Sequence, residues 1–107
     1  MATILLTLAD DGRRLAVDAG GIVEVELQEN PTTGYRWSPT VMPYGALDLL
    51  EQAFEPATGG GIGAGGRRRF RLRAVASGEA ILRFGLRRAW EHADTTQRTA
   101  EFILQIG

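Results

Sequence analysis

The sequence contains no cysteine and no lysine, and it holds a single histidine, His92. The absence of thiols excludes disulfide bridges, thiolate metal sites and cysteine nucleophiles, and it leaves the redox compartment open. One histidine in the polar stretch 91–97 makes no zinc site by itself, and neither Ser38 nor Ser77 has the surroundings of an activated nucleophile. We therefore expect no metal, no cofactor and no enzymatic activity.

Long apolar runs are also missing. No run approaches the roughly eighteen residues that a membrane-spanning helix needs, so no membrane partner is expected. The N-terminal MATILLTLADDGRR has too short an apolar stretch for a signal peptide and no basic residue before it, which favours a strand. The compartment stays open: cytoplasmic, or periplasmic or secreted after processing.

The charge is nearly balanced but unevenly distributed along the 107 residues. The formal net charge is −1, yet residues 1–55 hold nine acids and three arginines, whereas residues 56–107 hold four acids and nine arginines. Four of these arginines alternate along one predicted strand, and such an arginine ladder can bind nucleic acid phosphates. Because acids on neighbouring strands can pair with it, we expect a solvated, partly paired face and no nucleic acid partner. The ladder is Arg67, Arg69, Arg71 and Arg73, and the candidate acids are Glu24, Glu26, Asp48, Glu51 and Glu55.

Apolar residues mostly recur at a spacing of two, which is typical of half-buried strands. Residues 3–8 and 13–18, separated by the turn at Asp10-Asp11-Gly12, predict an N-terminal hairpin. Further strands are predicted at 22–28, from 35 up to Pro39, and at 67–75, 79–87 and 99–106, while 47–54 fits a strand or a short helical turn. Seven or eight short strands in one domain spanning 1–107 predict an all-β, immunoglobulin-like sandwich of mostly antiparallel strands.

The connection Asn30-Pro31-Thr32-Thr33-Gly34-Tyr35 is unusually stiff for a loop between two strands. Pro31 restricts its own φ and favours an extended Asn30, and Gly34 can take the positive φ of a tight reversal. The Asn30 side chain and the two threonine hydroxyls can hydrogen-bond nearby backbone groups. Such a loop loses little conformational freedom when it binds a partner.

At these residues the sequence resembles the chagasin family of cysteine protease inhibitors, whose signature is Asn-Pro-Thr-Thr-Gly followed by an aromatic residue. Two further motifs of that family are expected downstream. The glycine-rich one is found as Gly63-Ala64-Gly65-Gly66, and the Arg-Pro-Trp one is found imperfectly as Arg88-Ala89-Trp90. The resemblance covers nearly the whole chain, and alanine at position 89 departs from it.

The resemblance implies a reversible, tight-binding inhibitor of papain-like cysteine proteases, expected to be a monomer, with three loops at one end of the sandwich that enter the catalytic cleft. The loop from Asn30 to Gly34, with Tyr35 after it, would block the catalytic Cys–His pair. Gly63 to Gly66 would approach the substrate groove with their backbone, and Trp90 beside Arg88 would act as an aromatic anchor. The alternatives are an immunoglobulin-like binding or adhesion module and, less favoured, the nucleic acid site.

Residues 61–66 also satisfy the dinucleotide-binding pattern G-x-G-x-x-G. That pattern needs a preceding strand and a following helix, whereas the residues that follow here predict a strand. We therefore attribute the match to composition.

Overall fold

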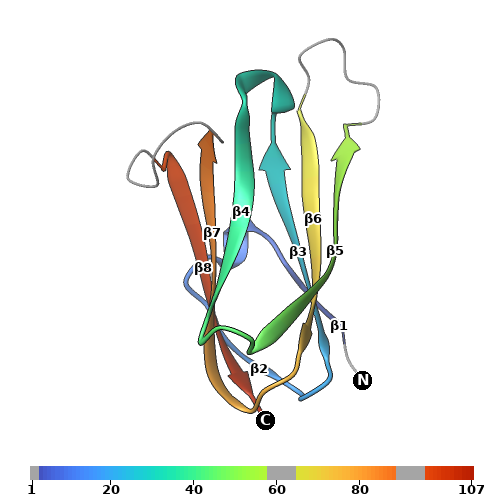
Figure 1. Cartoon of the computed structure of the whole chain (residues 1–107). Helices are drawn as coiled ribbons and strands as arrows, with labels where there is room; N and C mark the ends of the chain where they lie inside the picture. Colours follow the sequence, from blue (N-terminus) through green and yellow to red (C-terminus); the bar gives the residue numbers. More distant parts are fainter. Residues whose placement is uncertain (1–2, 58–64, 89–95) are drawn as a thin grey trace.

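The computed structural model describes residues 3–57, 65–88 and 96–107, and these residues form two four-stranded sheets packed face to face (Figure 1). The first sheet has the order β1 (Thr3–Leu6), β3 (Ile22–Glu29), β6 (Gly66–Ala74), β5 (Leu47–Pro56). The second has the order β2 (Arg14–Val17), β8 (Arg98–Ile106), β7 (Gly78–Arg88), β4 (Tyr35–Met42). Two short 3-10 turns, η1 (Leu8–Asp10) and η2 (Pro31–Thr33), lie between strands. The architecture is the all-β sandwich that the sequence predicts.

The core lies between the sheets and follows the alternation of each strand. Val23, Val25 and Leu27 of β3 are fully buried, while the residues between them are not. Three phenylalanines fill the centre, and the rings of Phe70 and Phe84 lie 4.8 Å apart in a tilted arrangement. Each large apolar side chain removed from water contributes about 1.5–3 kcal/mol, so this layer dominates the stability.

The predicted N-terminal hairpin is wrong. β1 pairs in parallel with β3 in one sheet, whereas β2 pairs in parallel with β8 in the other. Between them η1 turns the chain, capped by Thr7 through reciprocal hydrogen bonds with Ala9 and Asp10. Leu8, expected within the first strand of that hairpin, lies in this turn. Alternation identifies a strand but does not name its partner, which is why the hairpin was the natural prediction.

One strand boundary differs from expectation, and one undecided stretch proves to be a strand. Pro39 does not end β4, which continues to Met42, because β4 is an edge strand and a missing N–H is tolerated there. The undecided stretch 47–54 belongs to strand β5, an edge strand of the first sheet. It pairs with β6, with an irregularity between Leu49 and Glu51.

The helical elements among the described residues are two three-residue 3-10 turns, and neither could span a membrane.

The strand ends that flank the three predicted loops lie at one end of the sandwich, which we call the tip. This end holds the connection from β3 through η2 to β4 (Figure 1). It also holds the end of β5 with the start of β6, and the end of β7 with the start of β8 (Figure 1). The chain termini lie toward the opposite end (Figure 1).

Candidate functional site

The loop Asn30–Gly34 is held by hydrogen bonds among its own residues. The Asn30 Oδ1 atom accepts from the Thr32 N–H at 3.1 Å and from the Thr32 hydroxyl at 2.7 Å. The Thr33 hydroxyl donates to the Asn30 carbonyl at 2.8 Å and accepts from the Tyr35 N–H at 3.3 Å. Gly34 takes a φ of 80°, and its N–H donates to the Pro31 carbonyl. Asn30, Pro31, Thr32 and Thr33 all avoid burial, so the loop is both ordered and accessible.

Hydrogen bonds join the strand that enters this loop, β3, to the strand that leaves it, β4. The Trp37 N–H donates to the Glu29 carboxylate at 2.9 Å, and the Trp37 Nε1–H donates to the Gln28 carbonyl at 2.8 Å. β3 and β4 belong to different sheets, so no strand ladder connects them, and these two hydrogen bonds take its place. Trp37 is 2% exposed and belongs to the core, so it anchors the loop.

Glu29 is a functional candidate that the sequence prediction missed. It is the one charged or polar residue that is buried among the described residues, at 5% exposure. Arg68 of β6 binds its carboxylate in bidentate fashion, with Nε and Nη2 at 2.9 and 2.8 Å from Oε1. The sequence signal was available: Glu29 continues the inward alternation of Val25 and Leu27, as Arg68 does for β6.

The second segment meets the first through its glycines. A Cβ on Gly65 would lie 3.2 Å from the Glu29 carbonyl oxygen, and one on Gly66 would lie 2.2 Å from the Glu55 carbonyl oxygen. The Ala57 N–H donates to the Gly65 carbonyl at 3.1 Å. The backbone packing therefore excludes a side chain at Gly66 and leaves only a tight fit for one at Gly65.

The third segment reaches the first loop through Arg88. Its guanidinium lies over the Tyr35 ring, 4.5 Å from the centroid, and its Nε donates to the Thr33 carbonyl at 3.1 Å. Tyr35 and Arg88 are also directly opposite in the β4–β7 register. The end of β7 thus contacts the loop from the second sheet, whereas Gly65 approaches it from the end of the first sheet.

Of the twelve predicted site residues, nine lie in the described part of the chain and gather at the tip. Gly63, Ala64 and Trp90 lie outside the described residues, as do Ala89 and His92. The described ones are Asn30, Pro31, Thr32, Thr33, Gly34, Tyr35, Gly65, Gly66 and Arg88.

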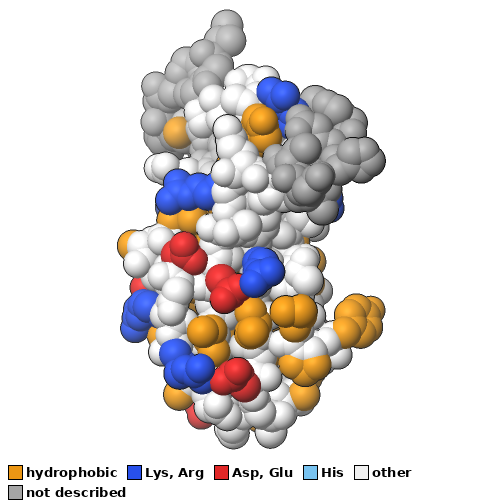
Figure 2. Space-filling model, turned by 90° about the vertical axis from the view of Figure 1, so that its left-hand side faces the viewer, with side chains coloured by type: hydrophobic (Ala, Val, Ile, Leu, Met, Phe, Trp, Pro, Cys, Tyr) orange, Lys and Arg blue, Asp and Glu red, His pale blue; other side chains and the backbone are white. Residues whose placement is uncertain are grey.

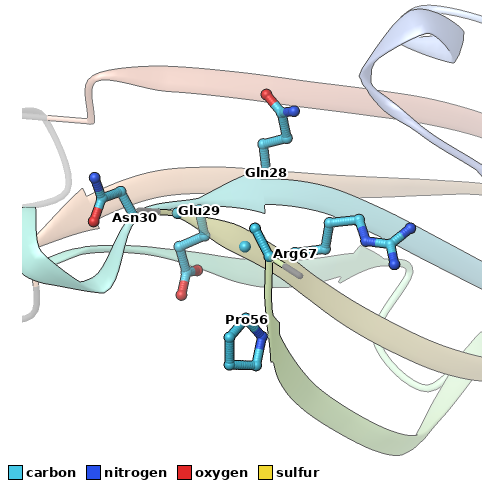
Figure 3. Close-up of a pocket in the computed structure, with 8 residues that line it drawn as sticks. Gln28, Glu29, Asn30, Pro56 and Arg67 are labelled. Atoms are coloured by element: carbon cyan, nitrogen blue, oxygen red, sulfur yellow. The ribbon is translucent and has the colours of Figure 1, made fainter. Parts of the chain in front are cut away.

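A cavity of about 540 Å³ opens at the tip between the end of β3 and the ends of β5 and β6 (Figure 3). Along β3, Gln28 and Glu29 point to opposite sides of the strand (Figure 3). The lining residues are Gln28, Glu29, Asn30, Pro56, Ala57, Gly65, Gly66 and Arg67. Its lining mixes charged and polar side chains with proline, alanine and glycine at an open surface, which suits contact with another macromolecule better than enclosure of a small ligand.

The arginine ladder is partly neutralised, as predicted. Arg67 and Arg69 each lie within ion-pair distance of both Glu26 and Glu55. Arg71 reaches Glu24 at 3.9 Å and Arg73 reaches Asp48 at 3.8 Å, whereas the fifth candidate acid, Glu51, forms no ion pair with another described residue. The ladder is therefore a paired outer face of the first sheet.

The outer face of the second sheet has another character. Apolar side chains gather on the half away from the tip, with oppositely charged side chains above and below them (Figure 2). The register places Met42 beside Ile81 and Ile81 beside Ile103, and two ion pairs, Arg83–Glu101 and Arg14–Glu79, belong to the same sheet.

Within residues 3–57, 65–88 and 96–107 no three carboxylate or histidine side chains could hold a metal ion.

A sandwich that presents a stiff, exposed loop from two rigid sheets defines a class of proteins that act by docking a preformed surface. The model of the chagasin family of peptidase inhibitors, I42, matches residues 16–106. The chain belongs to this family. It is accordingly a peptidase inhibitor and not an enzyme.

Relatives in sequence and structure agree with this membership. The chain is 30% identical over 89 residues to chagasin from Trypanosoma cruzi, a match that covers 79% of this chain and 81% of chagasin. It is 25% identical over 104 residues to amoebiasin-2 from Entamoeba histolytica, covering 95% and 84% of the two chains. The crystal structure of a cysteine protease inhibitor from Entamoeba histolytica matches with a TM-score of 0.89 at 26% identity, over 100% of this chain and 97% of that one.

Proposed function

We propose that this protein, as a single domain, inhibits papain-like cysteine proteases reversibly by inserting the tip of its sandwich into the catalytic cleft. The loop Asn30–Gly34 enters deepest and covers the catalytic Cys–His pair. The inhibitor contributes no chemistry, because occupation of the cleft is sufficient to exclude substrate.

The observation that carries this proposal is a loop that is exposed yet already ordered. A loop held by its own hydrogen bonds has little conformational entropy left to lose on docking, so more of the contact energy appears as affinity. Its peptide bonds also lie in a tight 3-10 turn ending at Gly34, so they do not present an extended, aligned bond for attack.

The flanking segments widen the proposed contact. The segment Gly63-Ala64-Gly65-Gly66 approaches the substrate groove with its backbone, since three of its four residues are glycines without a Cβ. On the other side of the cleft Trp90 serves as an aromatic anchor beside Arg88, the kind of residue that dominates interface energetics.

Titration of active-site-counted papain with the purified protein tests the function. We expect stoichiometric loss of activity that is recovered on dilution or gel filtration, as reversible tight binding requires. No inhibition at micromolar protein would contradict the proposal.

A matched pair of variants tests the site. Thr32→Ala with Thr33→Ala removes two hydroxyls from the tip, and Ser38→Ala with Thr40→Ala removes two hydroxyls from exposed positions of β4 away from it. The tip pair should raise the inhibition constant by about tenfold or more, by the usual size of hot-spot losses, while the control pair leaves it unchanged. Equal effects would remove the tip from the binding site.

A further inference from the structure

Glu29 stands at a junction of four strands just below the tip. It is the last residue of β3, it accepts the backbone N–H of Trp37 in β4, and it is held by Arg68 of β6. Arg68 in turn lies over the ring of Phe54 in β5, 5.5 Å from the centroid. One carboxylate thus contacts the strands that lead into and out of the first loop and the strand that follows the second segment.

The geometry leaves little freedom at this junction. The Glu29 side chain is 1% exposed and that of Arg68 is 11% exposed, so both charged groups are largely removed from solvent. Arg68 Nε lies 2.9 and 3.1 Å from the two carboxylate oxygens, and Nη2 lies 2.8 Å from Oε1. A planar guanidinium bound in this forked way fixes the plane and position of the carboxylate, which a single lysine-type contact would not do.

A buried ion pair is weak evidence for stability, because the loss of hydration offsets much of the mutual attraction. Apolar side chains of similar volume would fill the same space without that cost. Apolar side chains would not accept a hydrogen bond from the Trp37 N–H, however. In the described structure this bond joins β3 to β4, which lie in different sheets on either side of the loop. The pair has a specific task that packing alone does not perform.

We propose that Glu29, fixed by Arg68, is a positioning residue that holds the loop Asn30–Gly34 in its binding-competent shape. It acts through Trp37 and the end of β3 and does not itself touch the protease. The proposal rests on the proposed function, since it concerns how the same loop is kept ready. When the junction is lost, the loop samples other shapes, and only the competent fraction can dock.

The expected signature is kinetic. If the competent fraction falls to about one tenth, the apparent dissociation constant rises about tenfold through the association rate, because the docked complex has the same contacts as before. The dissociation rate should change by less than about twofold to threefold on the same reasoning. A residue in direct contact with the protease would instead act mainly on dissociation.

Two variants and two controls make the test. Glu29→Gln removes the charge, and Glu29→Met with Arg68→Met replaces the whole pair by apolar side chains in case the single variant does not fold. Glu101→Gln removes a carboxylate from the exposed pair with Arg83, and Leu104→Ala destabilises the core on β8 without touching the junction. Association and dissociation rates with papain are measured by surface plasmon resonance, well below each melting temperature.

The free protein supplies an independent readout. Amide hydrogen exchange of Thr32 and Gly34, measured by NMR, should accelerate by about tenfold in the junction variants relative to amides of β8, since local opening is what such exchange reports. Both controls should leave this ratio and the association rate unchanged. If the methionine pair associates at the wild-type rate with unchanged exchange, or if Leu104→Ala slows association equally, the proposal is overturned.

The two hypotheses fail separately. If the wild type does not inhibit papain, the proposed function falls while the exchange experiment still decides whether Glu29 holds the loop. If the wild type inhibits and the junction variants behave as the wild type does, only the positioning role is lost.

Discussion

The two connections on either side of β4 carry the chain between the sheets at opposite ends of the sandwich, and they achieve order in different ways (Figure 1). Residues 43–46 of the far turn rely on the core: Ala46 is 3% exposed, its N–H donates to the Pro43 carbonyl, and its carbonyl accepts from Val75. Residues 30–34 of the tip rely on their own polar side chains, with Asn30 and Thr33 bonding the backbone around them.

These two connections explain how a loop can be both rigid and accessible. A turn that buries a residue gains order from the hydrophobic effect but turns its face inward. The tip cannot do so, because its face must stay available to a partner, and it uses side-chain hydrogen bonds, a proline and a glycine instead. Tyr44 in the far turn is fully exposed, so its ring does not anchor that connection, whereas Ala46 is buried.

The largest effect should come from placing a charge at the anchor of the far turn. Ala46→Asp buries a carboxylate without a partner and should lower the free energy of unfolding by about 3 kcal/mol or more. Thr32→Asp at the tip should stay within about 0.5 kcal/mol, since that position is exposed. Urea unfolding followed by tryptophan fluorescence measures both, and equal losses would erase the distinction between the two connections.

Gly66 is the point where the tip itself depends on packing. Gly66→Ala places a Cβ 2.2 Å from the Glu55 carbonyl oxygen, and we expect a loss of about 3 kcal/mol from the forced backbone shift. Gly45→Ala in the far turn meets no atom within 4 Å and should lose only about 1 kcal/mol, from its φ of 88°. The same unfolding experiment ranks the two, and the reverse order would contradict this account.

Asn30→Ala should separate binding from stability. It removes the acceptor of two hydrogen bonds in the loop and should cost about 1 kcal/mol of stability, the usual value for a lost cap. Inhibition of papain should weaken by about tenfold because the loop is less preorganised. Asn30→Asp keeps an accepting oxygen and should lose less of both, so equal inhibition constants for the two variants would argue against the hydrogen bonds.

The smallest effect concerns η1, a turn capped by polar side chains away from the tip. A hydrogen bond from the Thr7 backbone N–H, and next the ion pair with Arg13, lower the pKa of Asp10. A depressed folded-state pKa stabilises above the unfolded value of 3.8 and is lost as the pH falls through the folded value. Melting curves should therefore show Asp10→Asn below wild type at neutral pH, with the gap closing below pH 3.8. A constant gap would contradict the assignment.

How much of the site the sequence predicts depends on how local each interaction is. The stiffness of the tip loop was predictable because Asn30, Thr33 and Gly34 act on backbone groups within three residues. The contact of Arg88 with Tyr35 was not, since it joins residues far apart in the chain. The same holds for Glu29 and Arg68: each fits the inward alternation of its own strand, but nothing local pairs them.

Alternation and turn chemistry act over a few residues, so the sequence alone predicts most of the strands, their apolar faces and the stiffness of the loop after β3. Three features depend on the assembled fold: β1 and β2 lie in different sheets, β4 continues through Pro39, and Glu29 meets Arg68 and Trp37 beneath the tip. Strand partners and buried ion pairs are chosen by long-range packing, where many alternatives share the same local pattern and differ only in what the assembled core can satisfy.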